Sequence, residues 1–287
     1  MFDALIKRAE VVMEALPYLR KFYGKVIVIK YGGNAMVDRE LKAKVIEAVV
    51  LLRYLGMHPV LVHGGGPEIT KELKKRKIEV KFLEGLRVTD GPTMDVVETV
   101  LGRVNSGIVS MINKGGRIAK GFSGKKGKIL KARKRVFFRN KQKVDLGFVG
   151  DVAFVDVKQL KGVIANGRIP VISSIGVDGK GRTYNINADI VASEIASALS
   201  AAKLILITNV RGVFDKRDKL ISAVNAAKIR RLIRNGVISG GMIPKVRCAL
   251  KALKEGVEKV HIIDGRIPHA ILLELFTDIG IGTMVER

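Results

Sequence analysis

Residues 26–36 read VIVIKYGGNAM, and this stretch decides the fold class. Four β-branched residues precede Lys30, a composition that is typical of a short buried strand. Two glycines follow the lysine at once, so the strand should end in a tight turn, although without the spacing of a Walker loop. We expect Lys30 to point into a crevice at the rim of a sheet. The alternative is a plain glycine turn with a solvated lysine.

Apolar strands and helices alternate along the rest of the chain. The glycine- and lysine-rich region 121–158 predicts a hairpin excursion. The whole pattern predicts an α/β fold, a three-layer αβα sandwich around a central, mainly parallel sheet whose strand ends line one rim. Further strands are expected at 59–66, 168–177, 203–214 and 257–265, and helices at 4–20, 38–55, 67–76, 222–236 and 241–256, and after Thr89 and Asp189.

The composition indicates a protein with one sizeable core. The chain has 287 residues, of which 47% are hydrophobic. No apolar run approaches the roughly 20 residues that span a bilayer, and the N-terminus lacks a signal-peptide layout, so we expect a cytoplasmic protein without a membrane partner. The single cysteine, Cys248, excludes an internal disulfide and falls in a helical pattern, which predicts a buried, unreactive thiol.

The chain is also strongly basic. Lys and Arg number 52 against 27 Asp and Glu, a formal net charge of +25, and the basic residues are densest at 114–143. Such a charge suits nucleic acids, anionic metabolites or an acidic protein partner, or reflects only a basic proteome. Because no RNA-recognition, zinc-finger or basic-zipper pattern accompanies it, we do not expect nucleic-acid binding as the primary function.

Glycines and polar residues near strand ends are candidates for an anion site. His63 precedes three glycines whose N–H groups would form a nest for a phosphoryl or carboxylate oxygen, although a sharp turn would also use glycines. We expect His63 itself to be a structural hydrogen-bonding residue. Arg87 lies between turn residues ahead of a helix, where its guanidinium would bind a carboxylate or form a surface ion pair.

Three later segments carry further candidates. Asn185, Asn187 and Asp189 alternate, so an extended backbone would place them on one face, unless Asp189 only caps the next helix. Segment 208–214 fits a nucleotide loop or a plain turn equally well. Two glycines precede a helix whose first turn carries Lys245, and a lysine at a helix N-terminus makes sense if a phosphate binds there.

Taken together and in this order, the motifs resemble those of one family. The runs IKYGGNAM, VHGGGPEI, GLRVTD, NINAD, LITNVRGV and GGMIPKV are similar to those of the amino acid kinase family, over essentially the whole chain. The resemblance implies the αβα fold of that family and ATP as a co-substrate. Within the family, the chain is similar to the members that phosphorylate the γ-carboxylate of N-acetyl-L-glutamate in the second step of arginine biosynthesis.

The resemblance also implies roles for single residues. Lys30 and Lys245 would contact the transferred phosphoryl group, and Asp189 would hold both lysines in place. The N–H groups of Gly33 and Gly65 would bind its oxygens. The acetylglutamate would be bound by Gly65, Gly66, Arg87, Asn185 and Asn187, and the nucleotide by Thr208, Asn209, Gly212, Val213, Phe214, Ser239 and Gly240.

The implied cofactor is ATP with Mg²⁺, and the phosphates would hold the metal because no carboxylate cluster predicts a metal site in the protein. Asn209 stands where the family commonly has an aspartate, which leaves the detail of the nucleotide loop open. Two other functions also stay open. One is a kinase for carrier-protein-bound aminoadipate in lysine biosynthesis, which the positive charge would suit; the other is a nucleic-acid-binding protein on the same fold.

Both ends of the chain resemble those of arginine-inhibited, hexameric members of the family. The similar segments are the helix ending in ALPYLRKFYGK and the tail HAILLELFTDIGIGTMV. By this resemblance, N-terminal helices would join dimers into a hexamer, unless residues 4–20 pack on their own lobe. L-Arginine would bind near Tyr18, His261, Glu274 and Gly280. The implied domains are 1–24 for oligomerisation and arginine, 25–190 for acetylglutamate and 191–287 for ATP.

Overall fold

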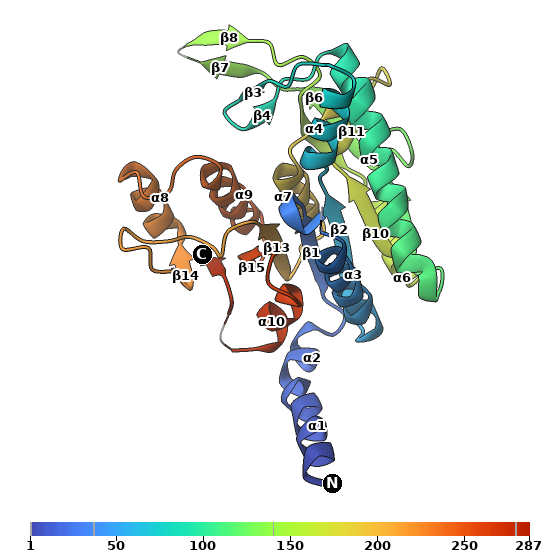
Figure 1. Ribbon diagram of the computed structural model, residues 1–287, viewed down its shortest axis with the longest axis vertical. Helices are drawn as coiled ribbons and strands as arrows, with labels where there is room; N and C mark the ends of the chain where they lie inside the picture. The colour runs from blue at the N-terminus through green and yellow to red at the C-terminus, as the bar shows by residue number, and fades with distance from the viewer. Residues whose placement is uncertain (1, 37, 140, 279) are drawn as a thin grey trace.

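The computed structural model describes residues 2–36, 38–139, 141–278 and 280–287 (Figure 1). In these residues the central sheet has eight strands, and each neighbouring pair is parallel except the antiparallel β15–β16 pair. A mainly parallel sheet was predicted and is confirmed. The order across the sheet is β14 (Ala223–Asn225), β16 (Thr283–Glu286), β15 (Lys259–Asp264), β13 (Lys203–Thr208), β1 (Val26–Tyr31), β2 (His58–His63), β10 (Ile169–Ser173) and β5 (Ala119–Phe122).

Helices cover both faces of this sheet because successive side chains of a strand point to opposite sides. Val28 belongs to a buried cluster with residues of α6 (Val157–Ala165), α7 (Ala188–Ala198) and α9 (Met242–Lys254). Its neighbours Ile27 and Ile29 belong to a second cluster, with residues of α3 (Arg39–Tyr54), α5 (Gly91–Ile112) and α10 (Ala270–Phe276). All three strand side chains are fully buried. The predicted three-layer arrangement is therefore confirmed.

A second, smaller sheet lies beyond the central one. Its strands are β12 (Thr183–Asn185), β11 (Ile175–Val177), β6 (Leu130–Lys134) and β9 (Gly150–Val155), in that order. The hairpins β3–β4 (Phe82–Leu83 and Leu86–Arg87) and β7–β8 (Phe137–Arg139 and Gln142–Val144) lie together at the top of Figure 1. The β6–β9 pair and the β7–β8 hairpin confirm the excursion predicted at 121–158.

Two predicted elements differ in kind from those observed. The strand predicted at 168–177 breaks at Ser174, because β10 stays in the central sheet while β11 pairs with β12 and β6. The helix predicted at 222–236 begins as strand β14, and α8 covers only Ala226–Arg234. In each case an apolar run was compatible with two structures, and a pairing partner distant in sequence decides between them.

The N-terminal helix predicted at 4–20 is two helices, α1 (Phe2–Glu14) and α2 (Leu16–Phe22). Pro17 has no N–H group to donate to the preceding turn, which explains the break. In Figure 1, α1 projects away from the rest of the molecule, and large apolar side chains along it, such as Val11 and Val12, are exposed. The remaining helical elements are α4 (Gly66–Lys75) and the 3₁₀ helices at Gly33–Met36 and Asn113–Gly115.

Candidate active site

A crevice of about 430 Å³ opens at the carboxyl ends of β1 and β2. The glycine turns after both strands, the β3–β4 hairpin and the first turns of α7 and α9 line it. Parallel strands end at one edge of a sheet, so residues distant in sequence meet there, as predicted. The predicted site residues that line the crevice are Lys30, Gly33, Gly65, Gly66, Arg87, Asn185, Asn187, Asp189, Thr208, Asn209 and Lys245.

Two lysines converge on one carboxylate in this crevice. Lys30 Nζ lies 3.1 Å from Asp189 Oδ1, and Lys245 Nζ donates a 2.8 Å hydrogen bond to Asp189 Oδ2. Burial alone would raise the pKa of Asp189, but the two lysines hold that pKa at about 2. Burial lowers the pKa of Lys30, and the charge of Asp189 opposes this. The arrangement fixes two ammonium groups side by side at the floor of the crevice.

The position of Asp189 decides between its two predicted roles. Asn187 is the N-cap of α7, and its side chain accepts a 2.8 Å hydrogen bond from the N–H of Asp189. Asp189 is the second residue of the helix, so the alternative that it only caps α7 is wrong. Its carboxylate does not cap the helix, so both carboxylate oxygens can contact the lysines.

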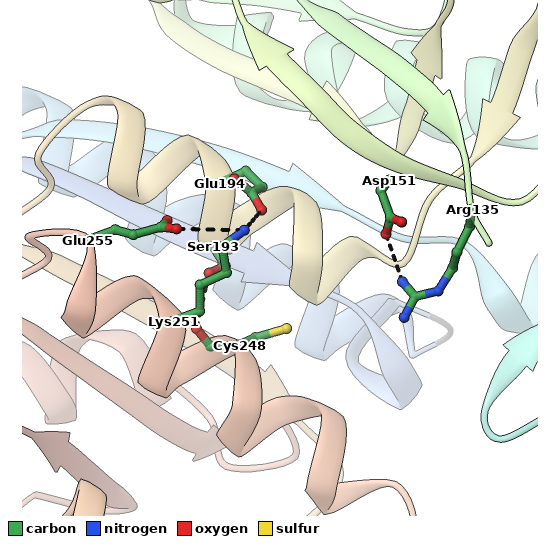
Figure 2. A network of polar contacts seen from close by, with 7 residues as sticks. All are labelled: Arg135, Asp151, Ser193, Glu194, Cys248, Lys251 and Glu255. Carbon is green, nitrogen blue, oxygen red and sulfur yellow. Dashed lines mark hydrogen bonds and ion pairs between the residues drawn. The ribbon is translucent and has the colours of Figure 1, made fainter. Parts of the chain in front are cut away.

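Contacts one turn further along hold α7 and α9 together (Figure 2). Ser193 Oγ donates a 3.0 Å hydrogen bond to the backbone O of Cys248, and Lys251 forms an ion pair with Glu194. These contacts fix the two helices that carry Asp189 and Lys245. Cys248 is buried in α9, as predicted, and burial raises the pKa of its thiol to about 12.

The glycine turns bring backbone close to the crevice. Gly33 has a φ of +76°, and a Cβ there would lie 2.4 Å from Asn209 Oδ1. A Cβ on Gly65 would lie 2.6 Å from the side chain of Leu101. Within the described ranges, the N–H of Gly65 has no hydrogen-bond acceptor. A crevice-lining glycine whose N–H has no acceptor fits the predicted anion nest.

Arg87 lines the same crevice and carries one buried donor without a partner among the described residues. Its Nη2 donates to Thr70 Oγ1 at 2.8 Å and to the backbone O of Gly66 at 3.1 Å, while its guanidinium lies 4.6 Å from the ring of Phe82. Its Nη1 is buried, and no described residue accepts from it. Burial lowers the pKa of Arg87. Because an unpaired buried charge is costly, this guanidinium fits the predicted binding of a carboxylate.

Thr70, Phe82 and Thr89 support the site without having been predicted. Thr89 Oγ1 donates to the backbone O of Arg87 at 2.8 Å and accepts from Asn185 Nδ2 at 3.2 Å. It therefore links Arg87 and Asn185, two of the five residues predicted to bind the acceptor. For Phe82, one signal was present in the sequence: the short segment 82–87 fits a hairpin that pairs it with Arg87.

Of the predicted nucleotide residues, only Thr208 and Asn209 line the crevice. Val213 is buried, and its N–H donates a 2.8 Å hydrogen bond to Thr283 Oγ1. A Cβ on Gly212 would lie 2.4 Å from the same oxygen. These two residues thus pack the loop against β16. The others outside the crevice are Phe214, on the same loop, and Ser239 and Gly240, just ahead of α9.

The four predicted arginine contacts lie around the C-terminal tail. His261 Nδ1 lies 2.5 Å from Glu274 Oε1, and a Cβ on Gly280 would lie 3.2 Å from that oxygen. Tyr18 OH donates a 2.6 Å hydrogen bond to Asp278 Oδ1. Lys203, which the sequence did not single out, is buried nearby, and burial lowers its pKa to about 8 while the charge of Glu274 opposes this.

Two absences concern the described residues. These residues contain no group of three or more His, Cys, Asp and Glu side chains arranged to hold a metal ion. No helix within the described ranges has the length and apolar character needed to cross a membrane.

The αβα fold, with two lysines beside a glycine-lined crevice, fits a phosphotransferase. Residues 25–264 match the model of the amino acid kinase family, and the chain belongs to that family. It is similar over its full length to acetylglutamate kinases. That of Syntrophobacter fumaroxidans is 51% identical over 290 residues, covering 99% of this chain and 97% of the relative. That of Trichormus variabilis is 54% identical over 282 residues, covering 97% and 93%.

A solved structure is similar as well. The N-acetylglutamate synthase of Neisseria gonorrhoeae, complexed with coenzyme A and N-acetyl-glutamate, superposes with a TM-score of 0.88 at 25% identity. The alignment covers 97% of this chain but only 63% of the synthase, so the synthase has further regions without a counterpart here.

Proposed function

We propose that this protein transfers the γ-phosphoryl group of ATP to the γ-carboxylate of N-acetyl-L-glutamate, the second step of arginine biosynthesis. The observation that carries the proposal is the cluster of Lys30, Asp189 and Lys245 in the same crevice as the unpaired Nη1 of Arg87. The similarity to acetylglutamate kinases over the full length supports the same acceptor. A cytoplasmic location remains part of the proposal.

The acceptor is bound through its charge. Arg87 Nη1 takes one carboxylate of acetylglutamate, while Nη2 stays on Thr70 and Gly66. Asn185, whose side chain donates to Thr89, contributes an amide to the acceptor site. Asn187 lines the same crevice. A planar guanidinium fixed on one side is a preorganised partner for a carboxylate, so little conformational entropy is lost when the acceptor binds.

The transfer step requires positioning and positive charge. Because a glutamate side chain has a pKa of about 4.3, the acceptor is ionised at neutral pH and needs no general base. One carboxylate oxygen attacks the γ-phosphorus; the new O–P bond forms as the bond to the bridging β–γ oxygen breaks, and its electron pair leaves with ADP. Lys30 and Lys245 offset the charge of the moving group, and the N–H groups of Gly33 and Gly65 bind its oxygens.

The nucleotide occupies the β13 side, where Thr208 and Asn209 line the crevice. Gly212, Val213, Phe214, Ser239 and Gly240 would form the outer part of its site. Asp189 is the one carboxylate among the described lining residues, and two ammonium groups already contact it. This donor set does not fit a protein-held metal, so Mg²⁺ would arrive bound to the phosphates of ATP.

A coupled assay of ADP release tests the proposal. Purified protein with ATP and free N-acetylglutamate should release ADP, and omission of the acceptor should abolish the signal. Turnover only with an aminoadipate linked to an acidic carrier protein would favour the lysine-pathway alternative. Salt-sensitive RNA binding without any turnover would favour the nucleic-acid alternative.

We also propose feedback inhibition by L-arginine in a hexameric assembly. The support is a second polar cluster, distinct from the crevice, in which His261 Nε2 is buried without a described partner and Lys203 is buried beside Glu274. Tyr18 joins α2 to the tail of this cluster through Asp278. The exposed apolar side chains of α1 supply a surface that a second subunit would cover. Adding arginine to the assay above should slow turnover.

A further inference from the structure

His63 is a fully buried titratable residue next to the crevice, and the proposed mechanism gives it no role. It is the last residue of β2 and directly precedes the three glycines. Its Nδ1 lies 2.8 Å from the backbone O of Gly64, and its Nε2 lies 3.0 Å from Nδ2 of Asn105 in α5. Both ring nitrogens are therefore engaged, one of them by the glycine turn itself.

The surroundings of Asn105 fix which ring nitrogen carries the proton. Asn105 Nδ2 also lies 3.0 Å from the backbone O of Val171 and 3.3 Å from that of Phe122. A side-chain amide between two carbonyl oxygens must present its NH₂ group to them, and its two hydrogens are shared among these oxygens and His63 Nε2. Because the group that faces Nε2 is a donor, Nε2 is an acceptor without a proton. The proton then sits on Nδ1, which donates to Gly64. Burial lowers the pKa of His63 to about 4, so this neutral form persists at physiological pH.

Holding the carbonyl of Gly64 also orients the next N–H group. The C=O of Gly64 and the N–H of Gly65 belong to one trans peptide unit, so they point in opposite directions. With the carbonyl held by His63, the N–H of Gly65 is turned away from the ring. Gly65 itself lines the crevice. Without this contact, a peptide between two glycines has access to several orientations.

We propose that His63 and Asn105 are positioning residues for phosphoryl transfer: they lock the Gly64–Gly65 peptide so that the N–H of Gly65 is presented to the transferred group. This inference rests on the proposed function and on the role proposed for Gly65. A donor aimed in advance at the charge that develops in the transition state accelerates the reaction without tightening ground-state binding. His63 thus affects phosphoryl transfer only through the orientation of the Gly64–Gly65 peptide.

Two amide substitutions at His63 separate the functions of the two ring nitrogens. In His63→Asn the amide nitrogen is bonded to Cγ, as Nδ1 is, so the donor to Gly64 is retained. In His63→Gln the amide lies one carbon further out, so the partner of Asn105 is retained and the donor is lost. Both variants place a polar amide in the same buried space, so each serves as the folding control of the other, checked by thermal unfolding.

The expected result is a fall in kcat of about tenfold to a hundredfold for His63→Gln, with KM for ATP and acetylglutamate changed less than about threefold. His63→Asn should recover most of that loss. Binding of MgADP with aluminium fluoride and acetylglutamate, which mimics the transition state, should weaken by the same factor as kcat, while binding of MgADP alone stays unchanged.

Equal kcat values for the two variants, or a rise in KM without a change in kcat, would overturn the inference and leave the proposed function intact. If only one variant folds, its affinity for the aluminium fluoride complex relative to MgADP decides by the same criterion. Absence of turnover by the unsubstituted protein would instead remove the proposed function and this inference with it.

Discussion

Lys245, in the first turn of α9, donates a hydrogen bond to one carboxylate oxygen of Asp189, in the first turn of α7. The other oxygen of that carboxylate lies beside Lys30 at the end of β1. One carboxylate thus sets the position of two cations that come from opposite ends of the chain. Two positive charges with one negative charge leave a net positive site, which is the electrostatic requirement of a phosphoryl group in transfer.

Replacing either lysine should remove this net charge. Lys30→Ala and Lys245→Ala should each lower kcat more than about a hundredfold, the scale for losing one preorganised contact to the transition state. The control is Lys254→Ala, an exposed lysine in the last turn of α9, which should stay near the unsubstituted rate. Near-normal turnover in both active-site variants would refute the proposed roles.

Arg87 should affect the acceptor more than the nucleotide. Arg87→Lys keeps the charge but cannot bind Thr70, Gly66 and a ligand carboxylate with one planar group. Loss of a charge-assisted hydrogen bond is worth about 1.5–3 kcal/mol, so KM for acetylglutamate should rise about 10- to 100-fold. Steady-state kinetics with each substrate varied in turn measure this. A rise confined to KM for ATP would contradict the assignment.

Protonation of His63 should destabilise the fold in mild acid. Burial lowers its pKa from 6.5 to about 4, so the unfolded chain binds a proton between these values while the folded chain does not. The stabilising contribution is complete above pH 6.5 and is lost as the pH falls towards 4, by about 3 kcal/mol in total. Denaturant unfolding from pH 7 to 4 should therefore show a steeper loss than in His63→Asn. Parallel curves would contradict this.

Removal of α1 should separate assembly from catalysis. Deleting residues 1–14 keeps α2, whose Phe22 is buried in the core. The deletion takes away the exposed apolar surface of α1, so light scattering after gel filtration should detect a smaller oligomer. Arginine inhibition should weaken, while the uninhibited rate stays within about twofold. A truncated protein that is still hexameric and fully inhibited would remove the role proposed for this helix.

The sequence predicted the parts of the site that have local signals. A β-branched run that ends in lysine and glycine, and glycines ahead of a helix, placed Lys30, Gly65 and Lys245 at strand ends and helix starts, and the rule for open sheets brought them to one edge. The structure places them in one crevice. The sequence also contained the signal for the break of the first helix, because Pro17 lies within the single helix predicted at 4–20.

Other parts depended on contacts that no local pattern reports. Thr70 and Lys203 take their roles from neighbours distant in sequence, Arg87 and Glu274. The short strand at 223–225 exists because the C-terminal strand β16 lies beside it, and its residues alone fit a helix equally well. The predicted nucleotide loop also depends on a distant contact, because Val213 packs against Thr283 and does not face the crevice.

The place of β1 between β13 and β2 has a consequence for how such a protein can diverge. In the proposed function, the turn after β13 would meet the nucleotide, while the β3–β4 hairpin with Arg87, beyond β2, would meet the acceptor. Substitutions near Arg87 could then alter the choice of acceptor without changing Lys30, Asp189 and Lys245. A single architecture can therefore acquire a new specificity while retaining its chemistry.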